Sequence, residues 1–461
     1  MSRNSSGIGF IMTLFLMGSC QDQATDVPLL KVSDNHRFLQ DENGEPFFWL
    51  GDTGWLLFSK LNREEAERYL ENRAAKGFNV IQAMVLHNVN ASNFYGDAAL
   101  VNGDVSQPFL TSGSSFENDE EYDYWDHVDY IIRLAGKKGI YMALVPVWGS
   151  NINGGLVSHE QAQNYASWLA KRYAPERNII WLNGGDTRGS DSTYTWNIIG
   201  ESIRKNAPDH LITFHPFGRT MSSMWFHNAP WLDFNMFQSG HRRYDQDDSE
   251  LGYGQDNWKY VRDDYSLVPV KPTIDGEPSY EGIPQGLHDP AEPCWTENDV
   301  RRYAYWSVFA GAFGFTYGHS AVMQMHKPGD HGGYGVREYW YEAMDAHGAS
   351  QMIHLKNLMH SYPYFERIPD QTIIADQPGE KYTYLAATRG RDYALVYTFT
   401  GRNMEIAMGK ISGSKVKASW LNPRNGEKSM LGEFGNSGKI TFDPPGDQEE
   451  GNDWVLILEA L

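Results

Sequence analysis

Between residues 47 and 318, short apolar runs alternate with longer segments in which apolar residues recur at helical spacing. Such alternation is typical of βα units, in which buried parallel strands are joined by helices. Eight apolar runs are predicted to be strands: 47–50, 78–86, 140–147, 179–182, 211–214, 232–237, 271–274 and 314–317. Eight strands that alternate with helices predict an α/β fold of the (β/α)8, or TIM barrel, type.

Helix-capping residues support the helices between these runs. Asn62 is followed by Glu65, and Ser158 by Gln161, and both pairs have the spacing of a capping box. Thr296 begins an amphipathic segment that extends to about residue 310. An open, doubly wound sheet is the alternative architecture, but no glycine-rich phosphate-binding fingerprint follows the first strand.

Beyond a last helix predicted at 345–360, the pattern changes to short alternating strands at 382–387, 393–399, 415–420, 440–442 and 454–458. Turn-forming pairs such as Asn422-Pro423 and Asn425-Gly426 lie between them. This pattern predicts a small antiparallel β-sandwich. We therefore expect a (β/α)8 barrel domain over residues 28–368 and a β-sandwich domain over residues 369–461.

The first 20 residues have the pattern of an export signal. Arg3 precedes an apolar segment at 8–17, which is shorter than the roughly 20 residues that span a membrane. Gly18-Ser19-Cys20 then resembles a bacterial lipobox, in which Cys20 would be the lipidated first residue of the mature protein. We expect a signal peptide at 1–20 and an outer-membrane lipoprotein that faces the periplasm or the cell surface, with secretion without an anchor as the alternative.

Composition narrows the range of partners. The chain has 461 residues, of which 41% are hydrophobic, and a formal net charge of −20. No Lys/Arg-rich tract stands out, which argues against nucleic acid and leaves the lipid anchor as the expected contact with a membrane. Cys294 is the only cysteine besides Cys20, so the mature protein is expected to fold without an internal disulfide.

The predicted strand ends carry the candidate chemistry, because active sites of (β/α)8 barrels lie at the carboxyl ends of the strands. Polar and aromatic residues are frequent there, in chain order Asp52, Trp55, His87, Asn88, Trp148, Asn183, Asp186, His215, Gln238, His241, Glu277, Tyr317 and His319. Aromatic faces stack on sugar rings, while carboxylates and amides bind hydroxyl groups. The pattern predicts a site for an oligo- or polysaccharide.

Asp186 and Glu277 are the best candidates for a catalytic pair. Hydrolysis of a glycosidic bond requires one carboxylic acid to protonate the leaving oxygen and one carboxylate to attack the anomeric carbon or to activate water. The fourth and seventh strands lie across the barrel mouth from each other, so these two residues can face each other there. Asp186 then needs a raised pKa, whereas Glu277 must stay ionised.

Structural alternatives exist for the carboxylates. Asp186 precedes Thr187 and could cap the following helix, although the preceding Gly184-Gly185 favours a turn that projects it toward the mouth. Glu277 could pair with an arginine in its loop. Asp52 is as well suited to a structural role inside the barrel as to binding a sugar hydroxyl.

The remaining candidates are similarly open. The rings of Trp55, Trp148 and Tyr317 suit a core as well as a sugar. The histidines lack the local spacing of metal ligands, so no metal and no cofactor is predicted. Four arginines in the same loops could provide the positive patch that an acidic glycan needs, or could simply be solvated: Arg188, Arg219, Arg242 and Arg243.

Five stretches are distributed along the chain from about residue 30: HRFLQDENGEPFFWLGDTGW, AAKGFNVIQ, WLNGGDTRG, PTIDGEPSYEG and HLKNLMHSYPYFERIPDQ. Together they resemble apiosidase-like glycoside hydrolases of family 140. The resemblance extends through the predicted sandwich, with SWLNPRNGE, which is similar to a module named for collagen binding. We do not take that name as evidence of collagen binding, and expect the sandwich to pack against the barrel and to rigidify loops at its mouth.

The resemblance implies a barrel enzyme whose acid/base is an aspartate after the fourth strand and whose nucleophile is a glutamate after the seventh. These correspond to Asp186 and Glu277. It also implies a retaining hydrolase that cleaves apiosidic linkages in branched pectin, and we expect the long loops at 87–122 and 319–344 to set its specificity. The competing hypothesis is a non-catalytic surface lipoprotein that binds a glycan or a protein.

Overall fold

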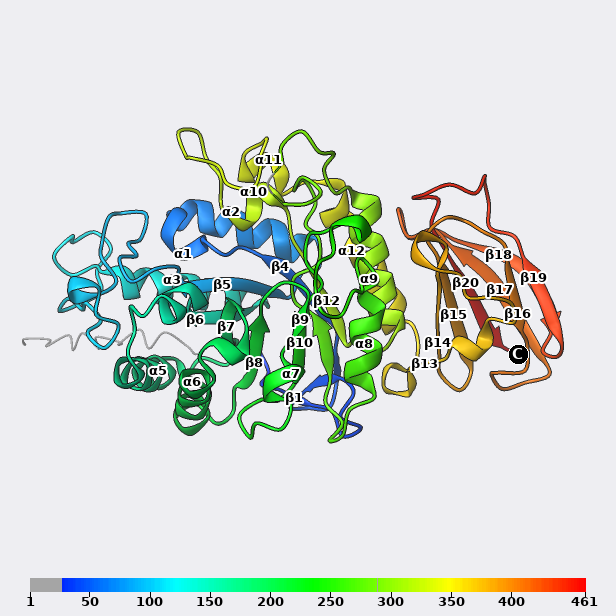
Figure 1. Ribbon diagram of the computed structural model, residues 1–461, viewed down its shortest axis with the longest axis horizontal. Helices are drawn as coiled ribbons and strands as arrows, with labels where there is room; N and C mark the ends of the chain where they lie inside the picture. The colour runs from blue at the N-terminus through cyan, green and yellow to red at the C-terminus, as the bar shows by residue number, and fades with distance from the viewer. Residues whose placement is uncertain (1–26, 288) are drawn as a thin grey trace, which may run out of the picture.

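A computed structural model describes residues 27–287 and 289–461 (Figure 1). The predicted signal peptide and Cys20 lie outside this range. Within it, no helix has both the length and the apolar character needed to cross a membrane. The chain forms a barrel with surrounding helices and, beside it, a domain of antiparallel sheets.

The barrel contains all eight predicted strands. They are β4 (Trp49–Thr53), β5 (Val80–Leu86), β6 (Tyr141–Val147), β7 (Ile179–Thr187), β8 (Leu211–Pro216), β10 (Asn235–Gln238), β11 (Thr273–Asp275) and β12 (Gly314–Tyr317). Neighbouring strands are parallel in the order β8-β7-β6-β5-β4-β12-β11-β10, and β9 (Thr220–Met221) is antiparallel to β10. The predicted (β/α)8 class is confirmed.

The ring closes between β8 and the entry to β10, where the sheet has no regular ladder. Asp233 donates a backbone hydrogen bond to Ile212 O at 2.9 Å, and Thr213 Oγ1 donates to Phe234 O at 2.6 Å. A closed barrel brings the carboxyl ends of all its strands to one mouth. Residues far apart in the sequence therefore meet there.

Helices surround the barrel. The longer ones are α2 (Arg63–Ala75), α3 (Tyr124–Lys137), α5 (His159–Tyr173), α6 (Thr193–Asn206), α8 (Asn257–Tyr265), α9 (Glu297–Phe309) and α12 (His347–His360). Short helices lie in the loops: α1 (Leu57–Lys60), α4 (Gly149–Asn153), α7 (Ser223–Phe226), α10 (Ser320–Met323) and α11 (Trp340–Ala343). The capping boxes predicted at Asn62 and Ser158 are both present, and Thr296 caps α9 in the same way.

Three short strands precede the barrel and were not predicted: β1 (Leu30–Val32), β2 (Leu39–Asp41) and β3 (Pro46–Phe47). They form an antiparallel sheet. The predicted first strand at 47–50 is thus split between β3 and β4. Phe47 packs edge-to-face on Tyr141 of β6, with ring centroids 5.2 Å apart, so this sheet covers apolar side chains near the amino end of the barrel.

The C-terminal domain consists of two antiparallel sheets. One has the order β13-β14-β15-β20-β17-β18, with strands at Ile368–Pro369, Leu385–Arg389, Tyr393–Thr398, Trp454–Ala460, Lys415–Leu421 and Lys428–Gly435. The other pairs β16 (Met404–Ala407) with β19 (Lys439–Phe442). A separate apolar core includes Val396 and Leu456 from the first sheet and Met404 and Phe442 from the second, as expected for a β-sandwich.

The two domains share a continuous apolar interface. Helices α8, α9 and α12 lie between the barrel strands and the C-terminal sheets (Figure 1). Tyr305 of α9 stacks on Tyr397 of β15 with centroids 4.7 Å apart, and Trp258 of α8 stacks on Tyr384 at 4.2 Å. One hydrophobic cluster includes residues from both domains. The predicted packing of the sandwich against the barrel is therefore observed.

Candidate active site

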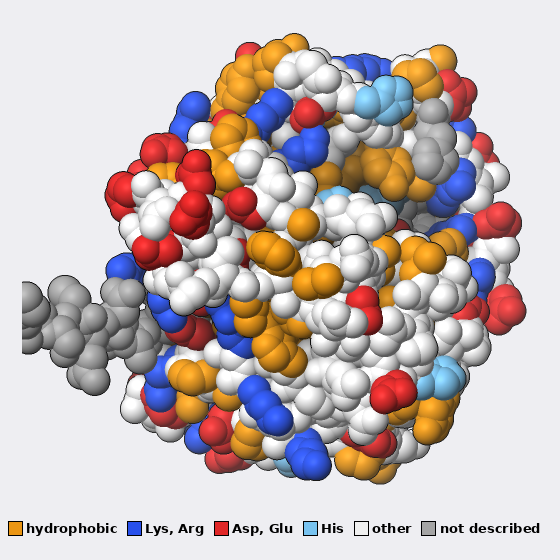
Figure 2. Space-filling model, turned by 90° about the vertical axis from the view of Figure 1, so that its left-hand side faces the viewer, with side chains coloured by type: hydrophobic (Ala, Val, Ile, Leu, Met, Phe, Trp, Pro, Cys, Tyr) orange, Lys and Arg blue, Asp and Glu red, His pale blue; other side chains and the backbone are white. Residues whose placement is uncertain are grey.

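A cavity of about 350 Å³ lies at the carboxyl ends of the barrel strands. It opens on the face shown in Figure 2, as a hollow in which hydrophobic and histidine side chains are visible. Both predicted catalytic carboxylates line it, together with five other predicted site residues: Trp55, His87, Trp148, Gln238 and His241. The fold thus brings together seven of the thirteen residues predicted at the strand ends.

Asp186 reaches the cavity because the backbone at the end of β7 has positive φ angles. Gly184, Gly185 and Asp186 have φ angles of 93°, 98° and 49°, and the pairing of β7 with β8 shifts register between Gly184 and Thr187. Glycine adopts positive φ at little cost, whereas aspartate is one of the few other residues that tolerates it. This irregular turn exposes the carboxyl group of Asp186 to the cavity.

The structure rules out helix capping by Asp186. The next regular helix, α6, begins at Thr193 with Ser192 as its N-cap, and the short 3₁₀ turn before it has Arg188 as its N-cap. Asp186 precedes both. The alternative role considered for this aspartate is therefore wrong.

Glu277 lies two residues beyond β11, and histidines hold its carboxylate. His241 Nε2 is 3.0 Å from Oε1, and His215 Nε2 is 3.3 Å from Oε2. Gly276, which precedes it, packs closely against the neighbouring strand, since a Cβ there would lie 2.5 Å from Met236 Sδ. Among the residues that the structure describes, no arginine lies within ion-pair distance of Glu277, so the loop ion pair considered for it is not found there.

A backbone hydrogen bond from Tyr280 orients the ring of His241. The backbone N–H of Tyr280 donates to its Nδ1 at 3.3 Å, so in the neutral ring the proton lies on Nε2. That Nε2–H then donates to Glu277. His241 therefore favours the ionised form of Glu277 by donating a hydrogen bond to it.

The two carboxyl groups have opposite pKa shifts. Although its side chain is open to the cavity, Asp186 is desolvated by the cavity walls, and this desolvation and the nearby charge of Glu277 raise its pKa to about 6. Burial acts in the same direction on Glu277, but the contacts from His215 and His241 outweigh it and lower the pKa of Glu277 to about 2. Between these values Asp186 carries a proton and Glu277 a negative charge, which is the division of roles that acid and nucleophile require.

The two carboxylates and His215 are close together. One oxygen of Asp186, one oxygen of Glu277 and one ring nitrogen of His215 all lie within 4.8 Å of one another. Among the described residues this is the one group of metal-type ligands with such spacing. Two imidazole nitrogens face the two oxygens of Glu277, at 3.0 and 3.3 Å.

Aromatic rings form one wall of the cavity. Trp55 and Trp148 line it with centroids 5.3 Å apart, and the Trp55 ring lies edge-on to His215 at 5.2 Å. His215 itself is fully buried and does not line the cavity. Its predicted role as a sugar contact is corrected to support of Glu277 from behind.

Five other predicted substrate contacts do not line the cavity. Asp52 is buried in an ion pair with Arg73, at 2.8 Å, and accepts a hydrogen bond from Tyr69. Its structural alternative is thus the correct one. The Tyr317 hydroxyl donates to Glu281 at 2.6 Å inside the core.

The other three are Asn88, Asn183 and His319. Asn183 donates to Trp196 O on the helix side of its strand, at 2.7 Å. Asn88 accepts from the backbone of Asn90 in a local turn, and His319 is the N-cap of α10. The sequence shows that these polar residues lie at or just after strand ends. It does not show which of their side chains point into the barrel mouth and which point to the surrounding helices.

The sequence analysis missed several residues that line the cavity, among them Tyr280, Gln324 and Tyr334. Gln324 and Tyr334 come from the loop at 319–344, for which a role in specificity was expected. Tyr280 follows Glu277 by three residues, so its proximity to a predicted carboxylate was an available signal. Burial, reinforced by Glu277, raises the pKa of Tyr280 well above its ordinary value, which keeps its hydroxyl protonated as a donor.

The four candidate arginines differ in their pairing. Arg243 is bound to Asp245 and Glu292, Arg219 pairs with Asp247 and Asp248, and Arg188 lies over the Phe217 ring. Arg219 and Arg242 line the cavity. Among the described residues, Arg242 has no carboxylate within ion-pair distance, and its Nη1 donates to Gly286 O at 2.9 Å.

The chain is similar to several known proteins. Residues 33–366 match the apiosidase-like catalytic domain, and residues 368–459 match a family described as "putative collagen-binding domain of a collagenase". No curated protein matches the chain. A solved structure named glycoside hydrolase is 49% identical, with a TM-score of 0.88, and the match covers 95% of this chain and 98% of that one.

Two structures from Bacteroides vulgatus ATCC 8482 are also similar. One, described as a glycoside hydrolase of family 5, is 45% identical with a TM-score of 0.89, covering 95% of this chain and 94% of that one. The other is 14% identical with a TM-score of 0.66, covering 95% and 83%, and so shows a shared fold alone.

The left-handed turn before Asp186 gives a first prediction. In the variant Gly185→Ala, the new Cβ would lie 2.7 Å from the Trp148 ring at a φ of 98°. We expect the free energy of unfolding to fall by about 2–4 kcal/mol, because backbone strain and displacement of a half-buried ring add. Urea unfolding followed by tryptophan fluorescence measures this.

Gly155→Ala is the matched control, since Gly155 also has a positive φ, 74°, but has open space around its Cβ position. It isolates the backbone contribution of about 1 kcal/mol. Equal losses in the two variants would contradict the close contact between Gly185 and Trp148.

Proposed function

We propose that this chain, which belongs to the apiosidase-like family of glycoside hydrolases, cleaves its glycan with Asp186 as the acid/base and Glu277 as the nucleophile. The observation that carries these roles is the pair of carboxyl groups with opposite pKa shifts in one cavity. An uncharged acid and an ionised carboxylate at short distance are what cleavage of a glycosidic bond requires.

The first step breaks the glycosidic bond. Asp186 transfers its proton to the leaving oxygen while an oxygen of Glu277 attacks the anomeric carbon, so that a glycosyl–Glu277 ester forms and an alcohol departs. Asp186 is then an ionised base. It takes a proton from a water molecule that attacks the anomeric carbon, which releases Glu277 and returns the proton to Asp186.

The short distance between the carboxylates supports retention of configuration. Retaining enzymes hold their two carboxyl groups about 5–5.5 Å apart, and inverting enzymes about 6.5–9.5 Å apart to admit a water molecule. Here the nearest oxygens of Asp186 and Glu277 lie within 4.8 Å of each other, which is compatible with the shorter of these separations. We therefore propose a double displacement through a covalent intermediate.

For the substrate we propose an apiosidic linkage in branched pectin, an inference from the family. Pectin is rich in carboxylates, and the chain as a whole is strongly acidic, so the site needs local positive charge. Arg242 can provide it, because it lines the cavity without an ion-pair partner among the described residues. Export as a Cys20 lipoprotein is also a proposal, which the acylation state of the mature N-terminus would test.

The first test compares wild type, Asp186→Asn and Glu277→Gln on a panel of pectic and other plant and algal oligosaccharides. We expect hydrolysis of an apiose-containing substrate, with a loss of about 10²–10⁴-fold in kcat for Asp186→Asn and a larger loss for Glu277→Gln. An aryl glycoside whose leaving group needs no proton should restore the first step for Asp186→Asn, but should not rescue Glu277→Gln.

The anomer released first, followed by proton NMR, distinguishes retention from inversion. Inverted product would contradict Glu277 as a nucleophile. If the wild-type protein binds the oligosaccharides in calorimetry but hydrolyses none of them, the competing hypothesis of a non-catalytic glycan-binding protein is favoured.

The pH profile provides a second test. Asp186 must be protonated, and raising the pH through its pKa of about 6 removes that proton. Glu277 must be ionised, and acid protonates it only near its pKa of about 2. We expect kcat/KM to be high in mildly acidic solution and to fall about tenfold per pH unit above pH 6. A profile that rises through pH 6 would reverse the assigned roles.

Arg242→Gln tests recognition of an acidic substrate. Loss of a charge-assisted hydrogen bond should raise KM about 10- to 100-fold for an oligosaccharide with a free carboxylate. The KM for the methyl ester of the same oligosaccharide should stay nearly unchanged. Arg243→Gln is the matched control, because the neighbouring Arg243 is already paired with Asp245 and Glu292. Equal effects on acid and ester would argue against contact between Arg242 and a substrate carboxylate.

A further inference from the structure

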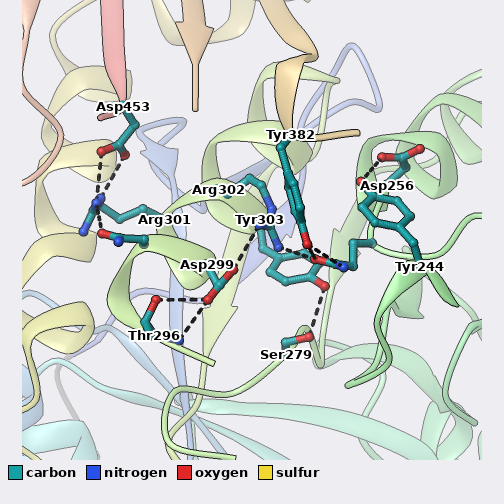
Figure 3. Close-up of polar contacts among 12 residues, drawn as sticks. Tyr244, Asp256, Ser279, Thr296, Asp299, Arg301, Arg302, Tyr303, Tyr382 and Asp453 are labelled. Carbon is teal, nitrogen blue, oxygen red and sulfur yellow. Dashed lines mark hydrogen bonds and ion pairs between the residues drawn. The ribbon is translucent and has the colours of Figure 1, made fainter. Parts of the chain in front are cut away.

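Helix α9 presents two adjacent buried arginines to the C-terminal domain (Figure 3). Arg301 forms a bidentate ion pair with Asp453, at 2.9 and 3.0 Å. Arg302 instead donates to Asp299 at 3.0 Å and to Gln255 at 2.8 Å. Arg301 thus anchors the C-terminal domain to α9. Arg302 begins a series of contacts that leads toward the cavity.

Tyr382 of the C-terminal domain completes the surroundings of Arg302. Its ring lies under the guanidinium at 4.8 Å, and its hydroxyl hydrogen-bonds to Gln255. The same ring packs edge-on against Tyr244, with centroids 5.6 Å apart. One side chain from the second domain thus contacts both a buried arginine of the barrel and residue 244.

Tyr244 belongs to the segment 239–247, which we call the histidine loop because it carries His241. This loop also contributes Gly240 and Arg242 to the cavity. Tyr244 Oη is bonded to Asp256 Oδ1 at 2.5 Å, and Lys381 of the C-terminal domain lies over its ring at 5.2 Å. The outer end of the loop is therefore held between the barrel and the second domain.

The inner end of the histidine loop is hydrogen-bonded to the segment after β11 that carries Glu277. Gly240 N donates to Glu277 O at 3.1 Å, and Ser279 Oγ donates to Gly240 O at 2.8 Å. Ser279 Oγ also lies 3.1 Å from the hydroxyl of Tyr303, the residue after Arg302. Since the serine has one proton, Tyr303 is the donor in that second bond.

These contacts form one connected set from Tyr382 to Glu277. We propose that Tyr382 is a positioning residue for the active site: by holding Arg302 and Tyr244 it fixes the histidine loop, and so keeps His241 on the carboxylate of Glu277. The C-terminal domain then completes the active site without touching substrate. The kinetic part of this inference rests on the proposed function, but the structural part does not.

The test compares Tyr382→Leu with Tyr384→Leu. Both tyrosines belong to the same segment of the second domain and make aromatic contacts across the interface, but Tyr384 stacks on Trp258 rather than on the loop. Amide hydrogen exchange of the full chain, followed by mass spectrometry, reports on residues 239–247. We expect exchange there to rise at least about threefold in Tyr382→Leu and to stay at the wild-type rate in Tyr384→Leu.

Two further variants complete this measurement. Tyr382→Phe keeps the ring and should retain nearly wild-type exchange. Tyr244→Leu breaks the same ring contact from the loop side and serves if Tyr382→Leu does not fold. No rise in exchange, or an equal rise in the Tyr382→Leu and Tyr384→Leu proteins, would overturn the proposal, because the interface would then act only by general stabilisation.

Kinetics supply the second readout on the substrate that wild type hydrolyses. Burial raises the pKa of Glu277, and the contact with His241 lowers it. If His241 moves away from Glu277, the effect of burial dominates and the pKa of Glu277 rises. Tyr382→Leu should therefore lower kcat and move the acidic limb of kcat/KM to higher pH, and Tyr384→Leu should do neither. An unmoved limb in Tyr382→Leu would overturn the link to Glu277. Absence of wild-type turnover would refute the proposed function while leaving the exchange result intact.

Discussion

The contact between two histidines and one buried carboxylate is the interaction on which the site depends. Two carboxyl groups whose nearest oxygens lie within 4.8 Å of each other cannot both be charged at low cost in a partly desolvated cavity. Imidazole nitrogens at 3.0 and 3.3 Å decide which one is charged, since they face Glu277 and leave Asp186 open to the cavity. Burial and the charge of Glu277 together raise the pKa of Asp186, so one set of contacts favours one ionised and one protonated carboxyl group.

That asymmetry requires exact backbone placement on two opposite strands. Gly184 and Gly185 turn the end of β7 so that Asp186 enters the cavity, and Gly276 allows β11 to pass close to Met236 before Glu277. The aromatic pair of Trp55 and Trp148 closes the space beside them. Strain and close packing at the strand ends are thus compensated by the closed barrel beneath them.

The sequence was sufficient for the parts of the structure that depend on local patterns. The apolar runs identified all eight barrel strands, and the pairs Asn62–Glu65 and Ser158–Gln161 identified two helix starts, because both signals act within a few residues. Strand β18 was missed since its residues are largely exposed and contain no apolar alternation. The roles of Asp52 and His215 could not be found locally, because Arg73 and Glu277, which determine them, lie far away in the sequence.

The same limit applies to the second domain. Its strands were largely predictable, but nothing in its own pattern indicates that Tyr382 would meet Tyr244 and Arg302 across the interface. Arg302 is fully buried, and a buried guanidinium is stable only when charge, hydrogen bonds and ring faces surround it. The barrel supplies Asp299 and Gln255, and the second domain supplies Tyr382. Arg302 is followed in the chain by Tyr303, whose hydroxyl hydrogen-bonds to Ser279, two residues after Glu277. The stability of the interface and the placement of Glu277 are therefore parts of one arrangement.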